Sequence, residues 1–192
     1  MAQSVITNQQ RKVELRRSLL KLRQSMSVEE WREKSDRLCF HLQASSLLAT
    51  PKTILAYFSF RQEPDLSSLF THSQHRWGFP RCVGKSLFWH VWQLGEPLQT
   101  GAYGIFEPFA DAPALKASEV DLILVPAVAC DVRGYRLGYG GGFYDRMLSA
   151  SEWASVPTIG IVFASAYLPN LPVEAWDVKL QGICTDKGLS YL

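Results

Sequence analysis

The stretch Leu122-Ile-Leu-Val-Pro126 decides the fold class of this chain, because it is apolar at nearly every position. A second run of the same kind, Ile159-Gly-Ile-Val-Phe163, follows later in the sequence. Continuous apolar runs are typical of strands in a parallel sheet, since helices cover both faces of such a sheet. Short runs rich in β-branched and aromatic residues predict further strands. The predicted strands span 53–58, 77–83, 87–92, 121–128 and 158–163. These observations predict an α/β fold.

Two helices are expected ahead of the first strand. Leu15, Leu19 and Leu22 recur at intervals of three and four residues, which predicts a helix over 8–24. Ser27-Val-Glu-Glu30 predicts a capping box at the start of a second helix. Short helices are expected at 65–73 and 142–149, and residues 93–116, rich in Gly, Pro and Ala, are expected to be mostly loop.

Composition excludes several classes of protein. The 192 residues are 47% hydrophobic and 20% charged, which describes a globular chain with a core of its own and excludes intrinsic disorder. Lys and Arg total 20 against 18 for Asp and Glu, so bulk charge gives no support for binding nucleic acid. No apolar stretch approaches the roughly 20 residues that cross a bilayer, and the start lacks a signal pattern. We expect a cytoplasmic protein of one domain over 1–192, with no membrane partner.

The four cysteines, Cys39, Cys82, Cys130 and Cys184, form no CxxC pair and are expected to be reduced packing residues. His72 and His75 have a spacing that suits a metal pair, but no third ligand matches them. We therefore expect the two histidines to lie in a solvated loop.

The densest chemical signal is Arg136-Leu-Gly-Tyr-Gly-Gly-Gly-Phe-Tyr-Asp145, which leads into a predicted helix. Its four glycines let backbone amides approach an anion at the positive end of that helix. Arg136 and Arg146 flank the turn and supply the charge that phosphate oxygens favour. Asp145 suits a metal that bridges phosphates, or else stabilises the helix start. The run matches neither a Walker loop nor the dinucleotide fingerprint, and it predicts a phosphate cradle, with a purely structural tight turn as the alternative.

The same run is similar to the hallmark of the 5-formyltetrahydrofolate cyclo-ligases, also called methenyltetrahydrofolate synthetases. Other segments typical of that family follow its order along nearly the whole chain. They are Lys12-x-x-x-Arg16, Met26-Ser-x-Glu-Glu30, Glu63-Pro-Asp65, Gly104-Ile-Phe-Glu-Pro108, and Asp177 followed by Thr185. The resemblance implies a single catalytic domain with a mainly parallel, Rossmann-like sheet flanked by helices and an N-terminal helical pair beside it.

The resemblance also implies an ATP- and magnesium-dependent ligase of one-carbon metabolism. Such an enzyme converts 5-formyltetrahydrofolate to 5,10-methenyltetrahydrofolate and releases ADP and phosphate. The formyl oxygen takes the γ-phosphoryl group, after which a neighbouring folate nitrogen closes the ring and phosphate departs. Phosphoryl transfer of this kind depends on holding and neutralising the phosphates more than on a covalent nucleophile. The implied partners are small molecules, ATP and a folate, and the implied assembly is a monomer or weak dimer.

Site residues are carried over by position. The resemblance places ATP against Lys12, Arg16, Arg136, Leu137, Gly138, Tyr139, Gly140, Gly141, Gly142, Phe143 and Tyr144. It places the folate against Phe58, Glu63, Tyr139, Gly140, Gly141, Gly142 and Phe143. It gives Mg²⁺ to Asp145 and Asp177, and catalytic roles to Arg136 and Asp145. Without the resemblance, Lys12 and Arg16 would be interpreted as a solvated basic helix face. The alternatives for the others are a core residue for Phe58, a strand end for Glu63 and a turn residue for Asp177.

Three positions depart from the family pattern. Tyr139 stands where some members carry Arg, Phe143 where many carry Tyr, and Ala166 near where a Gln often follows the late strand. One positive charge and one hydroxyl near the substrates are therefore absent. These changes leave open an alternative of a different class, a non-catalytic protein that binds reduced folate or nucleotide. Another ATP-dependent ligase that activates a formyl or carboxamide group is a further alternative.

Overall fold

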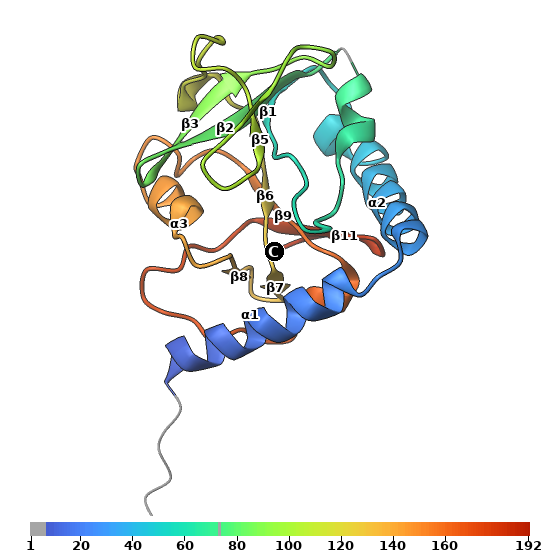
Figure 1. Ribbon diagram of the computed structural model, residues 1–192, viewed down its shortest axis with the longest axis vertical. Coiled ribbons are helices and arrows are strands. Elements are labelled where there is room, and N and C mark those ends of the chain that lie inside the picture. The colour runs from blue at the N-terminus through green and yellow to red at the C-terminus, as the bar shows by residue number, and fades with distance from the viewer. Residues whose placement is uncertain (1–6, 73) are drawn as a thin grey trace, which may run out of the picture.

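The computed structural model describes residues 7–72 and 74–192 of the chain. The central sheet contains β1 (Thr53–Leu55), β2 (Arg76–Val83), β3 (Ser86–Val91), β6 (Leu122–Pro126), β9 (Thr158–Ile161), β11 (Gly182–Thr185) and β12 (Gly188–Tyr191). Its strand order is β12-β11-β9-β6-β1-β2-β3 (Figure 1). Neighbouring strands from β11 to β2 are parallel, and only the edge strands β12 and β3 are antiparallel to their neighbours. The predicted α/β class with a mainly parallel sheet is confirmed.

Within residues 7–72 and 74–192, three α-helices and four short 3₁₀ helices accompany the sheets. The α-helices are α1 (Asn8–Gln24), α2 (Val28–Gln43) and α3 (Phe143–Leu148). The 3₁₀ helices are η1 (Ser46–Leu48), η2 (Ser67–Thr71), η3 (Ala117–Glu119) and η4 (Ala164–Ala166). The helix predicted over 8–24 is confirmed at both ends. The short helix expected over 65–73 is the 3₁₀ helix η2, and residue 73 of that prediction lies outside the described residues.

Strand β6 shows why a continuous apolar run forms the middle of the sheet. All of its residues from Leu122 to Val125 are buried. Leu124 packs on one face of the sheet in a core that includes Leu38 of α2. Ile123 packs on the other face in a second core that includes Met147 of α3. Because successive side chains point to opposite faces, an apolar residue is needed at every position.

Two smaller sheets were not foreseen in the sequence. One contains β7 (Ala129–Asp131), β8 (Arg136–Leu137) and β10 (Tyr167–Leu168), in the order β10-β7-β8. The other is the hairpin of β4 (Gln99–Thr100) and β5 (Phe106–Glu107), within a segment that is otherwise loop, as predicted. Helix α1 lies beside β7 and β8 (Figure 1), and its Leu15 and Leu19 pack against a small core cluster that includes Ala129 of β7 and Leu137 of β8. The three-stranded sheet thus joins the N-terminal helix to the segment that carries the glycines.

Asp131, at the end of β7, holds the connection between β7 and β8. It is fully buried, and its carboxylate accepts hydrogen bonds from the backbone N–H groups of Arg133, Tyr135 and Leu171. The Arg133 side chain also donates to it, with Nη2 at 2.6 Å from Oδ2. Burial alone would raise the pKa of Asp131, but these hydrogen bonds outweigh it and lower the pKa below its ordinary value. This buried carboxylate fixes where β8 begins.

The start of α2 differs from the prediction in one detail. Ser27 is the N-cap, and its hydroxyl accepts from the Glu30 N–H at 3.1 Å, as expected. The reciprocal half of the predicted capping box does not form, because the Glu30 carboxylate pairs with Lys34 at 2.6 Å. A complete capping box instead begins α1, between Thr7 and Gln10. The sequence located the helix start correctly and assigned the glutamate to the wrong partner.

The cysteines pack as the sequence predicts. All four cysteines carry free thiols; Cys39, Cys130 and Cys184 are buried, and burial raises the pKa of Cys130 to about 12, as expected of packing residues. No helix in the described part of the chain is long and apolar enough to span a membrane.

The expectation of a solvated loop is wrong for His75, which is buried and packs edge-on against Trp77.

Candidate active site

The glycine turn, residues 138–142, connects β8 to α3. Gly140 and Gly142 have φ angles of +104° and +67°, in the region that L side chains rarely adopt. A Cβ at Gly142 would also lie 2.7 Å from Nη1 of Arg146. The turn is exposed to solvent at 138–141. The backbone conformation therefore requires glycine at 140 and 142, and the exposed turn is open to a ligand.

Two guanidinium groups border the glycine turn. Arg16 of α1 donates from Nε to the Gly138 carbonyl at 2.7 Å, and its guanidinium lies 3.7 Å from where a Cβ of Gly140 would be. Arg146 donates from Nε to the Lys85 carbonyl at 2.9 Å. Arg16 was predicted to belong to this site. The structure brings it into contact with Gly138, although the two residues are more than a hundred positions apart in sequence. Positive charge on both sides of exposed backbone amides favours an anion.

Each carboxylate predicted to bind metal is paired with a cation. Arg136, whose side chain is nearly fully buried, donates from Nη2 to Oδ1 of Asp145 at 2.6 Å. Lys12 forms a buried ion pair with Asp177, which also accepts from the Glu174 N–H at 2.8 Å. Lys12 and Asp177 lie 165 positions apart in sequence, so the pair fastens α1 to the C-terminal segment. All four residues were predicted as site residues, and the structure joins them in two pairs.

The donor chemistry of these carboxylates fits a hard cation. Within the described residues, no group of three His, Cys, Asp or Glu side chains is arranged to hold a metal by itself. The Asp145 carboxylate is about one-third exposed, and only its Oδ1 atom takes the hydrogen bond from Arg136. Carboxylate oxygens combined with phosphate oxygens and water are a typical ligand set for Mg²⁺. Asp145 fits such a shared site, and Asp177 fits it once Lys12 turns to an anionic ligand.

Glu63 is buried in the loop between β1 and η2. Arg61 and Gln62 have φ angles of +50° and +55°, so the chain turns sharply before it. The Phe60 N–H donates to Oε2 of Glu63 at 3.1 Å, and Trp31 Nε1 donates to the Glu63 carbonyl at 2.8 Å. Burial raises the pKa of Glu63 to about 7, although Arg23 opposes the rise. A buried carboxyl with so few donors is suited to accept N–H groups from a ligand.

Tyr139 connects the glycine turn to Glu63. Its hydroxyl accepts a hydrogen bond from Nη2 of Arg23 and lies beside the Glu63 carboxyl. Its ring lies 6.3 Å from that of Phe60. Burial and the neighbouring Glu63 raise the pKa of Tyr139 to about 12, so the hydroxyl keeps its proton at neutral pH. The predicted phosphate turn and the predicted folate carboxylate therefore meet at one residue.

Aromatic residues around this region divide between site and core. Phe58, predicted to contact the folate, stacks on Phe79 with ring centroids 4.2 Å apart, within the core on one face of the sheet. Its contact with folate stays a prediction. Phe143 of the predicted site instead meets Tyr103, from the loop between β4 and β5, at 5.7 Å. The hydroxyl of Tyr144 is buried without a hydrogen-bond partner among the described residues.

Sequence reasoning missed Arg23 and Tyr103. Arg23 lies seven residues after Arg16 and therefore on the same face of α1. That spacing was a usable signal. Tyr103 lies in a loop far from the glycine turn in sequence, and no local pattern indicates their contact.

The sequence of this chain is similar to those of one known protein family. A family model described as "5-formyltetrahydrofolate cyclo-ligase family" matches residues 8–186. A 5-formyltetrahydrofolate cyclo-ligase of Haemophilus influenzae is 28% identical and is aligned over 90% of this chain and 96% of its own. One from Escherichia coli K12 is also 28% identical, over 85% of this chain and 93% of its own.

Two solved structures share the fold. The solution structure of an Aquifex aeolicus 5,10-methenyltetrahydrofolate synthetase matches with a TM-score of 0.82 and 31% identity, over 94% of this chain and 92% of that one. A Mycoplasma pneumoniae 5,10-methenyltetrahydrofolate synthetase matches with a TM-score of 0.72 at 22% identity, which supports the fold alone. The family match extends from the start of α1 to the residue after β11, and the Aquifex structure likewise covers most of the chain.

Proposed function

The chain belongs to the 5-formyltetrahydrofolate cyclo-ligase family, and from that premise we propose that it converts 5-formyltetrahydrofolate to 5,10-methenyltetrahydrofolate with ATP and Mg²⁺. The observation that carries the proposal is the position of the Tyr139 hydroxyl, which contacts both Arg23 and the Glu63 carboxyl. Through Tyr139, a glycine turn bordered by cations lies next to a buried carboxyl. A reaction between a nucleotide and a folate needs these two kinds of subsite side by side.

At the nucleotide end, the triphosphate binds along the glycine turn. Exposed backbone N–H groups at 138–141 supply donors, and Arg16 supplies a fixed positive charge beside Gly138. Lys12, on the same face of α1, adds a second charge once it exchanges Asp177 for phosphate. Arg136, buried beside Asp145, adds positive charge at the base of the turn, which favours the negative charge that moves between the phosphate oxygens during transfer.

Asp145 and Asp177 would hold Mg²⁺ together with the phosphates. When bound there, the cation would neutralise part of the phosphate charge and so lower the barrier to attack by a weak oxygen nucleophile. Arg136 keeps the Asp145 carboxylate oriented from the buried side, where Nη1 is itself fixed by the Val178 carbonyl at 2.9 Å. The exposed side of Asp145 is left for the ligand.

At the folate end, Glu63 accepts hydrogen bonds from the pyrimidine ring of the pterin. Tyr139 of the glycine turn and Phe143 at the start of α3 provide aromatic walls, and Tyr103 extends the wall of Phe143. The pterin lies between Glu63 and the turn, so the formyl group on its ring nitrogen faces the terminal phosphate. This arrangement sets the distance between the reacting atoms through rigid elements.

The reaction proceeds in two displacements. The formyl oxygen attacks the γ-phosphorus, a P–O bond forms, and the bond to the leaving ADP breaks. The second folate nitrogen then attacks the activated formyl carbon and loses its proton to solvent. The new C–N bond closes the ring, the C–O bond breaks, and phosphate departs with the former formyl oxygen. The chain's own residues hold the partners in place and stabilise charge, and no covalent enzyme intermediate is needed.

A direct assay tests the proposal. Purified protein is mixed with 5-formyltetrahydrofolate, ATP and Mg²⁺, and absorbance is followed at the band of the methenyl product. A rise that requires ATP and Mg²⁺ supports the proposal, and it should be accompanied by one ADP for each ring closed. Folate or nucleotide binding without any ATP-dependent rise supports the non-catalytic alternative. ADP release with another formyl or carboxamide acceptor, and none with this folate, supports a different ligase.

A further inference from the structure

Arg23, in the last turn of α1, has an unused hydrogen-bond donor at the folate end of the site. Only 8% of its surface is exposed. Its Nε atom donates to the Arg61 carbonyl at 3.1 Å, and Nη2 donates to the Tyr139 hydroxyl. Nη1 is buried and has no partner among the described residues. Buried donors of charged groups are almost always satisfied, so an unpaired one beside a ligand site points to an acceptor on the ligand.

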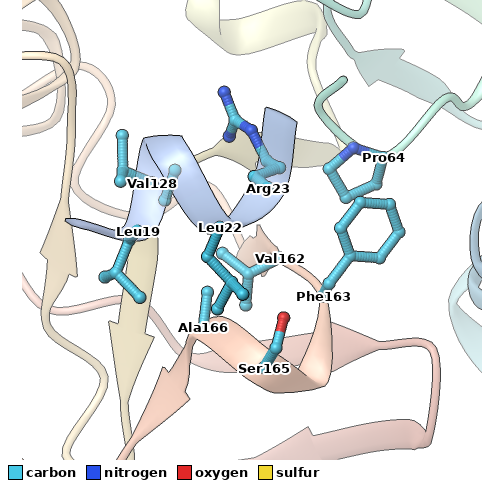
Figure 2. Close-up of a pocket in the computed structure, with 10 residues that line it drawn as sticks. Leu19, Leu22, Arg23, Pro64, Val128, Val162, Phe163, Ser165 and Ala166 are labelled. Atoms are coloured by element: carbon cyan, nitrogen blue, oxygen red, sulfur yellow. The ribbon is translucent and has the colours of Figure 1, made fainter. Parts of the chain in front are cut away.

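The small cavity beside Arg23 does not provide that acceptor. It has a volume of about 10 Å³ and is lined mostly by apolar side chains, among them Leu19, Leu22 and Val162. Figure 2 shows the guanidinium pointing away from Leu22 and from Ser165, the one hydroxyl in the lining. The stem of Arg23 packs at the cavity, while its charge acts on Glu63, whose pKa it lowers against the effect of burial.

The Tyr139 hydroxyl now occupies the space between Arg23 and Glu63. A phenol oxygen both accepts and donates, so it suits a guanidinium on one side and a carboxyl on the other. The edge of a pterin has the same alternation, because an acceptor carbonyl at position 4 adjoins the donor N–H at position 3. Tyr139 is 39% exposed, so it lies between solvent and the buried groups Arg23 and Glu63.

We propose that Arg23 binds the carbonyl oxygen at position 4 of the pterin, next to the N–H groups that Glu63 accepts, and that Tyr139 swings outward when the folate enters. The inference rests on the proposed function, since it takes a reduced folate as the ligand. Arg23 and Glu63 then distinguish a 4-oxo ring from a 4-amino ring. In the 4-amino ring, an N–H donor would face the guanidinium donor and leave both unpaired.

The test measures binding without ATP, so it does not depend on turnover. Dissociation constants of 5-formyltetrahydrofolate and of its 4-amino-4-deoxy counterpart are measured by calorimetry for the wild-type protein, Arg23→Gln and Arg17→Gln. A glutamine amide presents either a donor or an acceptor, so it accommodates both rings. Arg17 lies on the same helix, is exposed and serves as the matched control.

The wild-type protein and Arg17→Gln should prefer the 4-oxo ligand by roughly 10- to 100-fold, and Arg23→Gln should lose most of that preference. A purely structural role for Arg23 would weaken both ligands together and leave their ratio unchanged, which would overturn the inference. Wild-type protein that binds both rings equally well would overturn it without any variant. If the wild-type protein bound neither ring, the proposed function would be overturned as well. If it turned over 5-formyltetrahydrofolate with ATP but bound the 4-oxo and 4-amino rings equally, only the role of Arg23 would be overturned.

Discussion

Arg136 and Asp145 face each other across the glycine turn, with Nη2 of the arginine 2.6 Å from Oδ1 of the aspartate. Arg136 begins the short strand β8 before the turn, and Asp145 lies in the first turn of the following helix. The pair therefore closes the loop at its base, while the glycines between them stay exposed. An exposed loop with a closed base presents its backbone amides without having to order itself on binding.

Asp145→Asn should reduce turnover far more than it reduces stability. The amide keeps the volume and can still accept from Arg136, but it removes the charge needed for the metal. We expect kcat to fall about 100-fold or more, and the free energy of unfolding to fall by about 1 kcal/mol, since this pair is partly exposed. Turnover is measured by methenyl absorbance, and unfolding by urea titration.

Asp111→Asn, at an exposed loop aspartate, is the matched control for charge removal and should change neither quantity. If Asp145→Asn lost activity only in proportion to its loss of folded protein, Asp145 would be a helix-start residue and the proposed metal role would be wrong.

Gly140→Ala should weaken ATP binding and stability, whereas Gly138→Ala should leave stability nearly unchanged. Gly140 has a φ of +104°, where a Cβ costs about 1–2 kcal/mol. Gly138 has an ordinary φ and nothing within 4 Å of an added Cβ, so it serves as a control within the same turn. KM for ATP and thermal midpoints are compared for the two variants. Equal stability of both would show that the turn tolerates another backbone conformation.

The central sheet could be predicted because its strands are local patterns of apolar residues. The predicted strand at 121–128 and the observed β6 share the same buried run, and helix α1 ends where its leucine spacing ends. The strands β7, β8 and β10 have only two or three residues each, too few to show a period. They form because Asp131 collects donors from Arg133, Tyr135 and Leu171, and that convergence is visible only in three dimensions.

Some residues of the candidate site could likewise be predicted from a local sequence pattern, and others could not. The glycine turn could be found because glycines and flanking charges are contiguous in sequence. Glu63, Lys12 and Asp177 were found only through resemblance to a family, since a single acidic or basic residue carries no local signal. The ion pair between Lys12 and Asp177 joins residues near opposite ends of the chain, and no periodicity connects them.

Stability should fall as the pH rises through the range in which Glu63 ionises in the folded protein. Its pKa is about 7 when folded and 4.5 as a free side chain, so the folded state holds the proton more tightly. The free energy of unfolding should therefore decrease between about pH 4.5 and 7, by about 3 kcal/mol, and level off above. Arg23 opposes this rise in pKa, and the neighbouring phenols Tyr57, Tyr139 and Tyr144 stay neutral throughout.

Glu63→Gln removes the titrating proton and should flatten this part of the pH profile. Urea unfolding at half-unit pH intervals measures the effect, and contributions from other groups appear equally in both proteins. An identical slope in wild type and Glu63→Gln would mean that Glu63 ionises at its ordinary pKa, and that it is more open to solvent than the structure shows.

The buried pair of Lys12 and Asp177 predicts strong coupling between two single substitutions. Lys12→Met leaves a buried carboxylate unpaired, and Asp177→Asn leaves a buried ammonium, so each should destabilise the ligand-free protein by about 3 kcal/mol. The double variant removes both charges and should be far more stable than the sum of the two losses predicts. Lys34→Met breaks the exposed pair with Glu30 and should cost less than about 1 kcal/mol. If the losses from the Lys12 and Asp177 substitutions were additive, the pair would not hold α1 to the C-terminal segment. Some other contact would then have to position Lys12 near the glycine turn before ATP binds.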